Sequence, residues 1–204
     1  MRAYERKLEE NLIIHEDAVI VLSEIYGINP FIKSICQKFK KVGFDVFCPN
    51  IIGRQPFSYE KTDEAYEHFI HEVGFDTYQI INEQVRQLKI DYKKVFIVGF
   101  SVGATLAWRC CENPLCDGIV CCYGSRIRDY VDLNPVSPTI LLQAKETSFD
   151  VDSLRIQLEG KSNLLIYRFE AGHGFIDANS NSFDCLASVQ AEELIFNFLL
   201  KLKY

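Results

Sequence analysis

Ser101 stands in a pentapeptide whose spacing is typical of a nucleophilic serine, because residues 99–103 read Gly-Phe-Ser-Val-Gly. The Gly-x-Ser-x-Gly spacing marks a sharp turn from a strand into a helix, which exposes the serine hydroxyl. Small residues are needed because a side chain at Gly99 or Gly103 would crowd this turn. The first backbone N–H groups of the following helix, together with its dipole, would stabilise negative charge there. The pattern therefore predicts that Ser101 is a nucleophile.

A serine hydroxyl is a weak nucleophile unless a neighbouring base accepts its proton. Among the four histidines, His173 lies in a glycine-flanked loop directly after a predicted strand (Ala-Gly-His-Gly-Phe, residues 171–175). His15 precedes the first clear strand, whereas His68 and His71 lie on a predicted helix. His173 also follows the serine in the chain order that hydrolases with this turn use. We predict that His173 is the general base.

The elements that must position these residues alternate between apolar runs and helical patterns. The strongest predicted strand, residues 95–98, runs directly into the Ser101 turn, and a helix through Cys110 follows. Most strands are continuously apolar, which is typical of a parallel sheet covered by helices on both faces. We therefore expect one doubly wound α/β domain over residues 1–204. Further strands are expected at residues 19–22, 44–48, 118–123, 138–143 and 163–169, and further helices from Asn29 to Gly43, Lys61 to Val73, Asp76 to Leu88, Val151 to Leu158 and Leu186 to Leu202.

The composition limits the expected partners and location. The net charge is −6, and the sequence has no basic cluster of the kind that binds nucleic acid. The lysines at residues 38–41 are expected at a helix C-terminus, where cations suit the helix dipole. No stretch reaches the roughly 20 apolar residues of a membrane span, and the charged N-terminus does not resemble a signal peptide. We expect a cytoplasmic protein that acts on a small molecule, without a nucleic-acid or membrane partner.

The eight cysteines do not indicate a metal site or a disulfide framework. None of them forms the Cys-x-x-Cys spacing that structural metal sites favour. Two adjacent pairs, residues 110–111 and 121–122, lie in apolar patterns, which predicts that these four are small core residues. We expect no metal and no organic cofactor.

Four segments, in order along the chain, resemble the dienelactone hydrolase family. Residues 23–29 are similar to the family's Glu-x-x-Gly segment, and residues 49–54 are similar to a loop that begins Pro-Asp. The Ser101 turn falls at the family's nucleophile turn, and residues 171–175 fall at its Ala-Gly-His-x-Phe loop. The resemblance covers nearly the whole chain and implies an α/β-hydrolase fold.

The resemblance also implies roles for residues around the nucleophile. Glu24 would project into the site beside Ser101, although a carboxylate at a strand end can simply face water. The backbone N–H groups of Ile25 and Val102 would form the oxyanion hole, the pair of donors that stabilises a charged tetrahedral intermediate. These three residues are therefore expected to bind the substrate.

The sequence departs from the family pattern in ways that affect the chemistry. Ser101 stands where the family has cysteine, so the reaction depends more on the base, because a hydroxyl is not ionised near neutral pH. The positions at which the family binds a substrate carboxylate with arginine hold Thr62 (or Lys61) and Asp177. Because an aspartate would repel a carboxylate, we predict that dienelactone itself is not the substrate.

A further departure concerns the triad acid, which orients the histidine and stabilises its charged form. Thr147 stands at the family's acid position, and threonine accepts a hydrogen bond but carries no charge. Asp150, Asp152 and Glu146 are close enough in sequence to substitute, and we prefer Asp150. A carboxylate at Asp150 is equally typical of the cap of the helix expected from residue 151.

Two functions follow from these residues. The first is hydrolysis of a small carboxylic ester, lactone or thioester, in which Ser101 is acylated and His173 moves the proton. The second is a hydrolase-like scaffold that has lost catalysis and binds a small ligand or a protein partner, which Thr147 would explain. We favour the first. An acyltransferase with the same residues would differ only in its acceptor.

Overall fold

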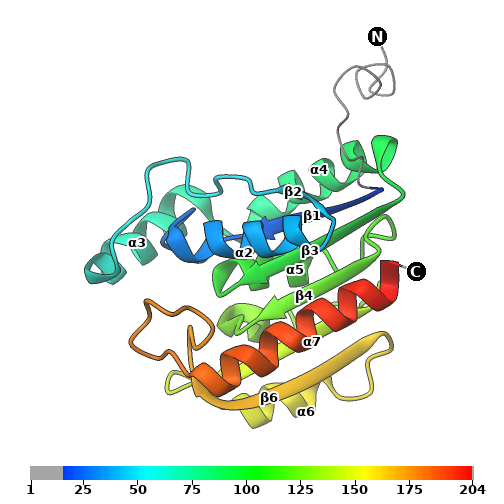
Figure 1. Cartoon of the computed structure of the whole chain (residues 1–204). Helices are drawn as coiled ribbons and strands as arrows, with labels where there is room; N and C mark the ends of the chain where they lie inside the picture. Colours follow the sequence, from blue (N-terminus) through cyan, green and yellow to red (C-terminus); the bar gives the residue numbers. More distant parts are fainter. Residues whose placement is uncertain (1–15, 204) are drawn as a thin grey trace.

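The computed structural model describes residues 16–203, so the charged N-terminus and His15 lie outside it. Six strands form one sheet in the order β2-β1-β3-β4-β5-β6, and all neighbouring strands are parallel (Figure 1). The expectation of a parallel sheet is confirmed. The strands are β1 (Asp17–Leu22), β2 (Asp45–Phe47), β3 (Lys94–Phe100), β4 (Gly118–Cys122), β5 (Thr139–Lys145) and β6 (Leu164–Gly172).

Helices cover both faces of this sheet. α2 and α7 lie on one face, and α3, α4, α5 and α6 lie on the other (Figure 1). The two faces explain the continuously apolar strands, because Val19 and Val21 pack toward α2 and α7 while Ile20 and Leu22 pack toward α4 and α5. The helices are α2 (Pro30–Lys41), α3 (Thr62–His68), α4 (Tyr78–Asp91), α5 (Val102–Arg109), α6 (Val151–Leu158) and α7 (Cys185–Lys203).

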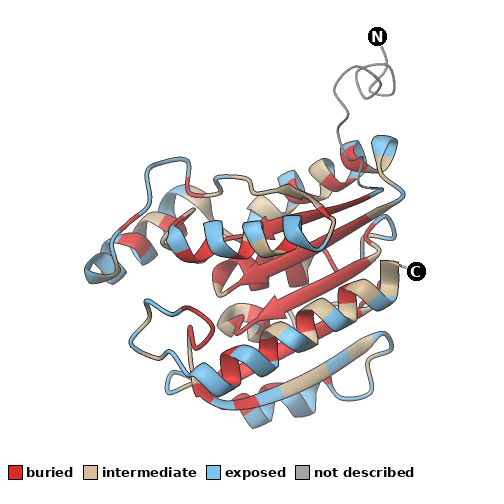
Figure 2. Cartoon of the chain, in the orientation of Figure 1, coloured by how far each residue is buried: buried red, intermediate tan, exposed pale blue. Residues whose placement is uncertain are grey.

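The core lies on both sides of the central strands. Figure 2 shows β1, β3 and β4 buried along their length, whereas the outer faces of α2 and α7 are exposed. The paired cysteines 110–111 and 121–122 are buried free thiols, which confirms their prediction as core residues. Among residues 16–203, no helix has the length and apolarity that crossing a bilayer requires.

The helices begin and end where local sequence signals predict, except for the helix expected over residues 61–73. The Asn29 side chain caps α2 by accepting a hydrogen bond from the Ile32 N–H at 3.0 Å, as expected. The single helix expected over residues 61–73 instead divides after His68, and residues 69–73 form a wider π-helical turn. The turn closes where the Gly74 N–H donates to the Phe69 carbonyl at 2.7 Å.

The sheet brings the ends of distant segments together. In a parallel sheet every strand ends at the same edge, and ligands bind where the strand order reverses, here between β1 and β3. Glu24 follows β1, Ser101 follows β3, Glu146 follows β5 and His173 follows β6. β6 extends to Gly172, beyond the expected end at residue 169, so His173 comes directly after the strand.

Candidate active site

Ser101 occupies a strained turn between β3 and α5. Its φ of 53° and ψ of −115° lie in a region that residues with a side chain rarely adopt. The flanking glycines permit this turn: a Cβ at Gly99 would lie 2.1 Å from the Gly103 carbonyl oxygen, and one at Gly103 would lie 2.5 Å from the Leu22 and Ser23 oxygens. The glycines therefore allow α5 to begin against the end of β1.

The Ser101 hydroxyl is hydrogen-bonded to His173. The distance from Ser101 Oγ to His173 Nε2 is 2.8 Å, which lets the hydroxyl donate to a neutral imidazole. Gly174 has a φ of 84°, so a glycine at this position allows the chain to turn immediately after the histidine. The structure thus brings together the two residues that the sequence predicted as nucleophile and base.

Glu146, rather than Asp150, contacts the other ring nitrogen of His173. Glu146 Oε1 lies 2.6 Å from His173 Nδ1, and the glutamate side chain is only 11% exposed. Asp150 instead caps α6, where its Oδ1 accepts from the Asp152 N–H at 2.9 Å and from the Ser153 N–H at 3.2 Å. The preference for Asp150 as the triad acid was wrong, because the start of α6 already holds that carboxylate.

A local irregularity of the sheet lies directly before both Glu146 and His173. Between the matched pairs Gln143–Arg168 and Lys145–Gly172, β5 advances by two residues while β6 advances by four. Such a bulge changes the direction of the chain and re-aims the side chains that follow it. The two extra residues lie on β6, which carries His173, and the residue that reaches His173 is Glu146, one position earlier than the family spacing implies.

The surroundings of His173 favour its protonated form. Burial alone would lower the pKa of the imidazole, but the hydrogen bond and negative charge of Glu146, together with the charge of Glu24, raise this pKa above 6.5. The ring is only partly shielded, with 37% of the side chain exposed. An imidazolium formed when His173 accepts the serine proton would therefore be stabilised by both carboxylates.

Glu24, Ile25 and Val102 lie around the same serine. Glu24 is buried, and burial raises the pKa of its carboxyl to about 7; the charge of His173 opposes this rise and that of Asp177 adds to it. Val102 is the first residue of α5, so its N–H is one of the first N–H groups of the helix, which have no acceptor within the helix. Ile25 and Val102 both line the pocket into which Ser101 opens.

That pocket has a volume of about 380 Å³, and its wall combines polar and apolar surface. Tyr26 and Thr62 are neighbours in this wall, where their hydroxyl oxygens share a hydrogen bond of 2.9 Å. Asp177 lies fully buried behind the wall, where it accepts a hydrogen bond from the Tyr59 hydroxyl. The remaining lining residues are Glu24, Ile25, Tyr59, Tyr66, Ser101, Val102, Ser125, Arg126, His173, Gly174 and Asn179–Ser182.

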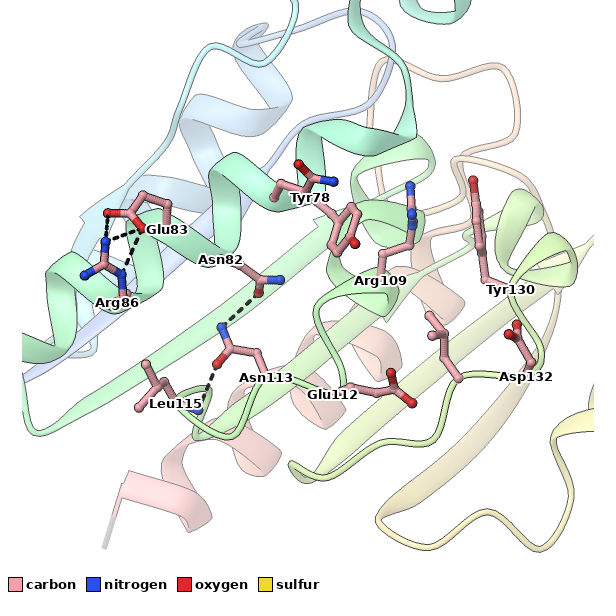
Figure 3. Close-up of a pocket in the computed structure, with 12 residues that line it drawn as sticks. Tyr78, Asn82, Glu83, Arg86, Arg109, Glu112, Asn113, Leu115, Tyr130 and Asp132 are labelled. Atoms are coloured by element: carbon pink, nitrogen blue, oxygen red, sulfur yellow. Dashed lines mark hydrogen bonds and ion pairs between the residues drawn. The ribbon is translucent and has the colours of Figure 1, made fainter.

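A larger hollow, of about 680 Å³, lies elsewhere on the molecule between α4, α5 and the loop after β4. Figure 3 shows the Arg109 side chain between the Tyr78 and Tyr130 rings. Arg109 Cζ lies 3.9 Å from the centre of the Tyr78 ring and 4.5 Å from the centre of the Tyr130 ring. Arg109 also pairs with Asp76 at 2.8 Å. The lining of this larger hollow contains no serine, cysteine or histidine. The smaller pocket is therefore the one with the means for nucleophilic chemistry.

Tyr123, and the contact of Tyr59 with Asp177, were not anticipated from the sequence near Ser101 and His173. Tyr123 follows β4 with a φ of 45°, and its buried ring lies edge-on to His173 with 5.1 Å between ring centres. Tyr59 holds the buried Asp177 by a hydrogen bond and accepts one from Asn29 at 2.9 Å. The position of Tyr123 at the end of a strand was the available signal. No sequence pattern links Tyr59 to Asp177, because the two residues are far apart in the chain.

The model of the dienelactone hydrolase family matches residues 2–202 of the chain. An uncharacterized protein of Bacillus subtilis, YczH, is 38% identical over 170 residues, which span 81% of this chain and 84% of that protein. Carboxymethylenebutenolidase 1 of Cupriavidus pinatubonensis is 26% identical over 201 residues, which span 91% and 86% of the two chains.

Solved structures share the fold. A dienelactone hydrolase-like promiscuous phosphotriesterase from metagenomic libraries superimposes with a TM-score of 0.74 over 95% of this chain and 90% of that chain. The two sequences are 15% identical, so this likeness concerns the fold alone. The expected α/β-hydrolase architecture is confirmed.

Proposed function

This chain belongs to the dienelactone hydrolase family, a family of hydrolases, and we propose that it cleaves small carboxylic esters, lactones or thioesters through an acyl-enzyme on Ser101. The observation that carries this proposal is the continuous hydrogen-bonded chain from the Ser101 hydroxyl through His173 to Glu146, with distances of 2.8 and 2.6 Å. A serine, a base and an orienting acid in this geometry are the requirements of nucleophilic catalysis.

The first half of the proposed reaction acylates the serine. Ser101 Oγ attacks the carbonyl carbon while its proton moves to His173 Nε2. The negative charge that develops on the carbonyl oxygen is stabilised by the N–H groups of Ile25 and Val102, and the positive charge on the imidazole is stabilised by Glu146. His173 then gives its proton to the leaving alcohol or thiol, and the acyl group stays on Ser101.

The second half returns the enzyme to its starting state. A water molecule gives a proton to His173 as its oxygen attacks the acyl carbon, and the second tetrahedral intermediate uses the same two N–H donors. Collapse of this intermediate releases the carboxylic acid and returns the proton to Ser101. Because serine needs the base in both halves, loss of His173 should affect acylation as well as deacylation.

The pocket supports a small substrate without a carboxylate beside the scissile bond. Thr62 bonds with Tyr26, and Asp177 lies behind Tyr59, so neither position supplies a cation. Arg126, which does line the pocket, donates to Asp129 at 2.5 Å. We therefore retain the proposal that dienelactone is not the substrate. We also retain the expectation of a free small molecule as partner and of a cytoplasmic location.

The alternative of a catalytically inactive scaffold was motivated by Thr147 at the acid position. Glu146 bonds to His173 in its place, so this observation no longer favours a scaffold over an enzyme. Hydrolysis and acyl transfer share every step up to the acyl-enzyme, and the distinction rests on the acceptor.

Turnover of p-nitrophenyl acetate tests the proposal. We expect measurable hydrolysis by the wild type and a loss of at least about 10³-fold in kcat for Ser101→Ala and for His173→Ala. His71→Ala is the matched control, because His71 is exposed and does not line the pocket, and it should retain activity within about twofold. Equal rates for the wild type and His173→Ala would favour the scaffold.

A further inference from the structure

Gln143 is a buried amide that has no hydrogen-bond partner among the described residues. It lies on β5, three residues before Glu146, and only 4% of it is exposed. Both its Nε2 and its Oε1 are enclosed without a partner. Native proteins rarely leave both polar atoms of a buried amide unpaired. We therefore expect this side chain to bond to a partner that is not part of the polypeptide.

A small cavity adjoins Gln143 and the triad acid. Its volume is about 10 Å³, and Gln143, Glu146, Ser125 and Phe149 are among its lining residues. This volume is close to the roughly 10–15 Å³ that one water molecule requires, and a buried water also needs two to four polar partners. The amide of Gln143, the carboxylate of Glu146 and the hydroxyl of Ser125 can supply them.

We propose that this cavity binds one water molecule, through which Gln143 holds Glu146 in position for His173. The amide Nε2 donates to the water, and the water donates to Glu146 Oε2, because Oε1 already accepts from His173. The second hydrogen of the water is available to Gln143 Oε1 or Ser125. Gln143 is thus a positioning residue that acts through Glu146, and this inference rests on the proposed function.

The position of Gln143 in the strand gives this arrangement a structural reason. Glu146 follows the bulge between β5 and β6, where the ladder of regular backbone hydrogen bonds is interrupted. A carboxylate carried by such a segment needs support from elsewhere to keep a fixed direction. Gln143 is in regular register with Arg168 on β6, so it can provide that support from the ordered part of the sheet.

A crystal structure of the wild type at high resolution tests the water site without reference to activity. We expect density for one ordered water within hydrogen-bond distance of the Gln143 amide and Glu146 Oε2. A cavity without density, or a Gln143 side chain bonded directly to other protein groups, would overturn the proposal.

The variant Gln143→Leu tests the positioning role, with Thr105→Val as its matched control. Thr105 is another buried polar side chain without a partner among the described residues, and it does not line this cavity. For Gln143→Leu we expect kcat for p-nitrophenyl acetate to fall on the order of tenfold, because the base loses its fixed orientation. KM should stay within about twofold, because Gln143 is absent from the substrate pocket wall.

The proton NMR spectrum separates positioning from a general loss of structure. The wild type and Thr105→Val should show a strongly downfield signal from the His173 Nδ1 proton, and Gln143→Leu should shift or broaden it. Unchanged kcat and an unchanged signal in Gln143→Leu would refute the role of Gln143. If Gln143→Leu does not fold, the wild-type crystal structure decides. If the wild type and Thr105→Val are both inactive, the proposed function fails instead.

Discussion

Replacing Glu146 by glutamine removes one negative charge from the catalytic site and changes little else. The amide has nearly the shape of the carboxylate, and its oxygen can still accept from His173 Nδ1 over the observed 2.6 Å. What disappears is the charge that stabilises the imidazolium. The amide can also turn its NH₂ group toward the ring, which would favour the wrong tautomer of His173.

The geometry sets the size of the expected loss. Two opposite charges about 4 Å apart interact by about 4 kcal/mol at an effective dielectric constant of about 20. Solvent reaches 37% of the His173 side chain and screens part of this interaction, while misorientation of the ring adds to the loss. We expect a net cost of about 4 kcal/mol in the transition state, which corresponds to about 10³-fold in kcat.

The assay is p-nitrophenyl ester hydrolysis by Glu146→Gln and Asp150→Ala between pH 5 and 9. In the wild type, kcat/KM should rise with pH as His173 loses its proton. The pKa of this step should lie above 6.5, because Glu146 raises the pKa of His173. In Glu146→Gln this step should move to lower pH. Asp150→Ala should keep kcat within about twofold but lose about 1 kcal/mol of stability with the helix cap. Activity lost in Asp150→Ala and kept in Glu146→Gln would refute the reasoning.

Three further predictions follow from individual contacts. Gly99→Ala should abolish activity and lower the free energy of unfolding by more than about 3 kcal/mol in urea titrations, because its Cβ would lie 2.1 Å from the Gly103 oxygen. For Glu24→Gln, the free energy of unfolding should gain about 2–3 kcal/mol relative to the wild type as the pH rises from 5 to 8. The pKa of the Glu24 carboxyl rises from 4.5 to about 7 on folding, so its ionisation over that interval destabilises the folded wild type. An ester with a carboxylate on its acyl chain should react on the order of tenfold more slowly than a neutral ester of equal length, and Asp177→Asn should narrow the difference.

The fold could be predicted largely from the sequence because burial leaves a direct pattern. The runs around Val19 and Val95 are apolar on both faces, and that pattern is typical of a parallel sheet covered on both sides. The Asn29 cap marked the start of α2 for an equally local reason. The π-helical turn after His68 was not predictable, because the apolar spacing of residues 61–73 fits an ordinary α-helix equally well.

In the site, too, residues fixed by local backbone geometry could be predicted, whereas residues fixed by contacts between distant segments could not. Ser101 and His173 could be found because their flanking glycines are demanded by local backbone geometry. The acid could not be chosen, because the contact of Glu146 with His173 joins the ends of two strands that are distant in the sequence. The buried link from Tyr59 to Asp177 is likewise a contact between segments far apart in the chain.

Covalent labelling of the wild type with a fluorophosphonate probe tests the central claim most directly. The serine oxygen should displace fluoride from phosphorus and leave one adduct per chain, which peptide mass spectrometry should place on Ser101. Ser101→Ala should take up no label under the same conditions, and Glu146→Gln should react more slowly. An unlabelled wild type that is folded by circular dichroism, or an adduct on a different residue, would contradict the account.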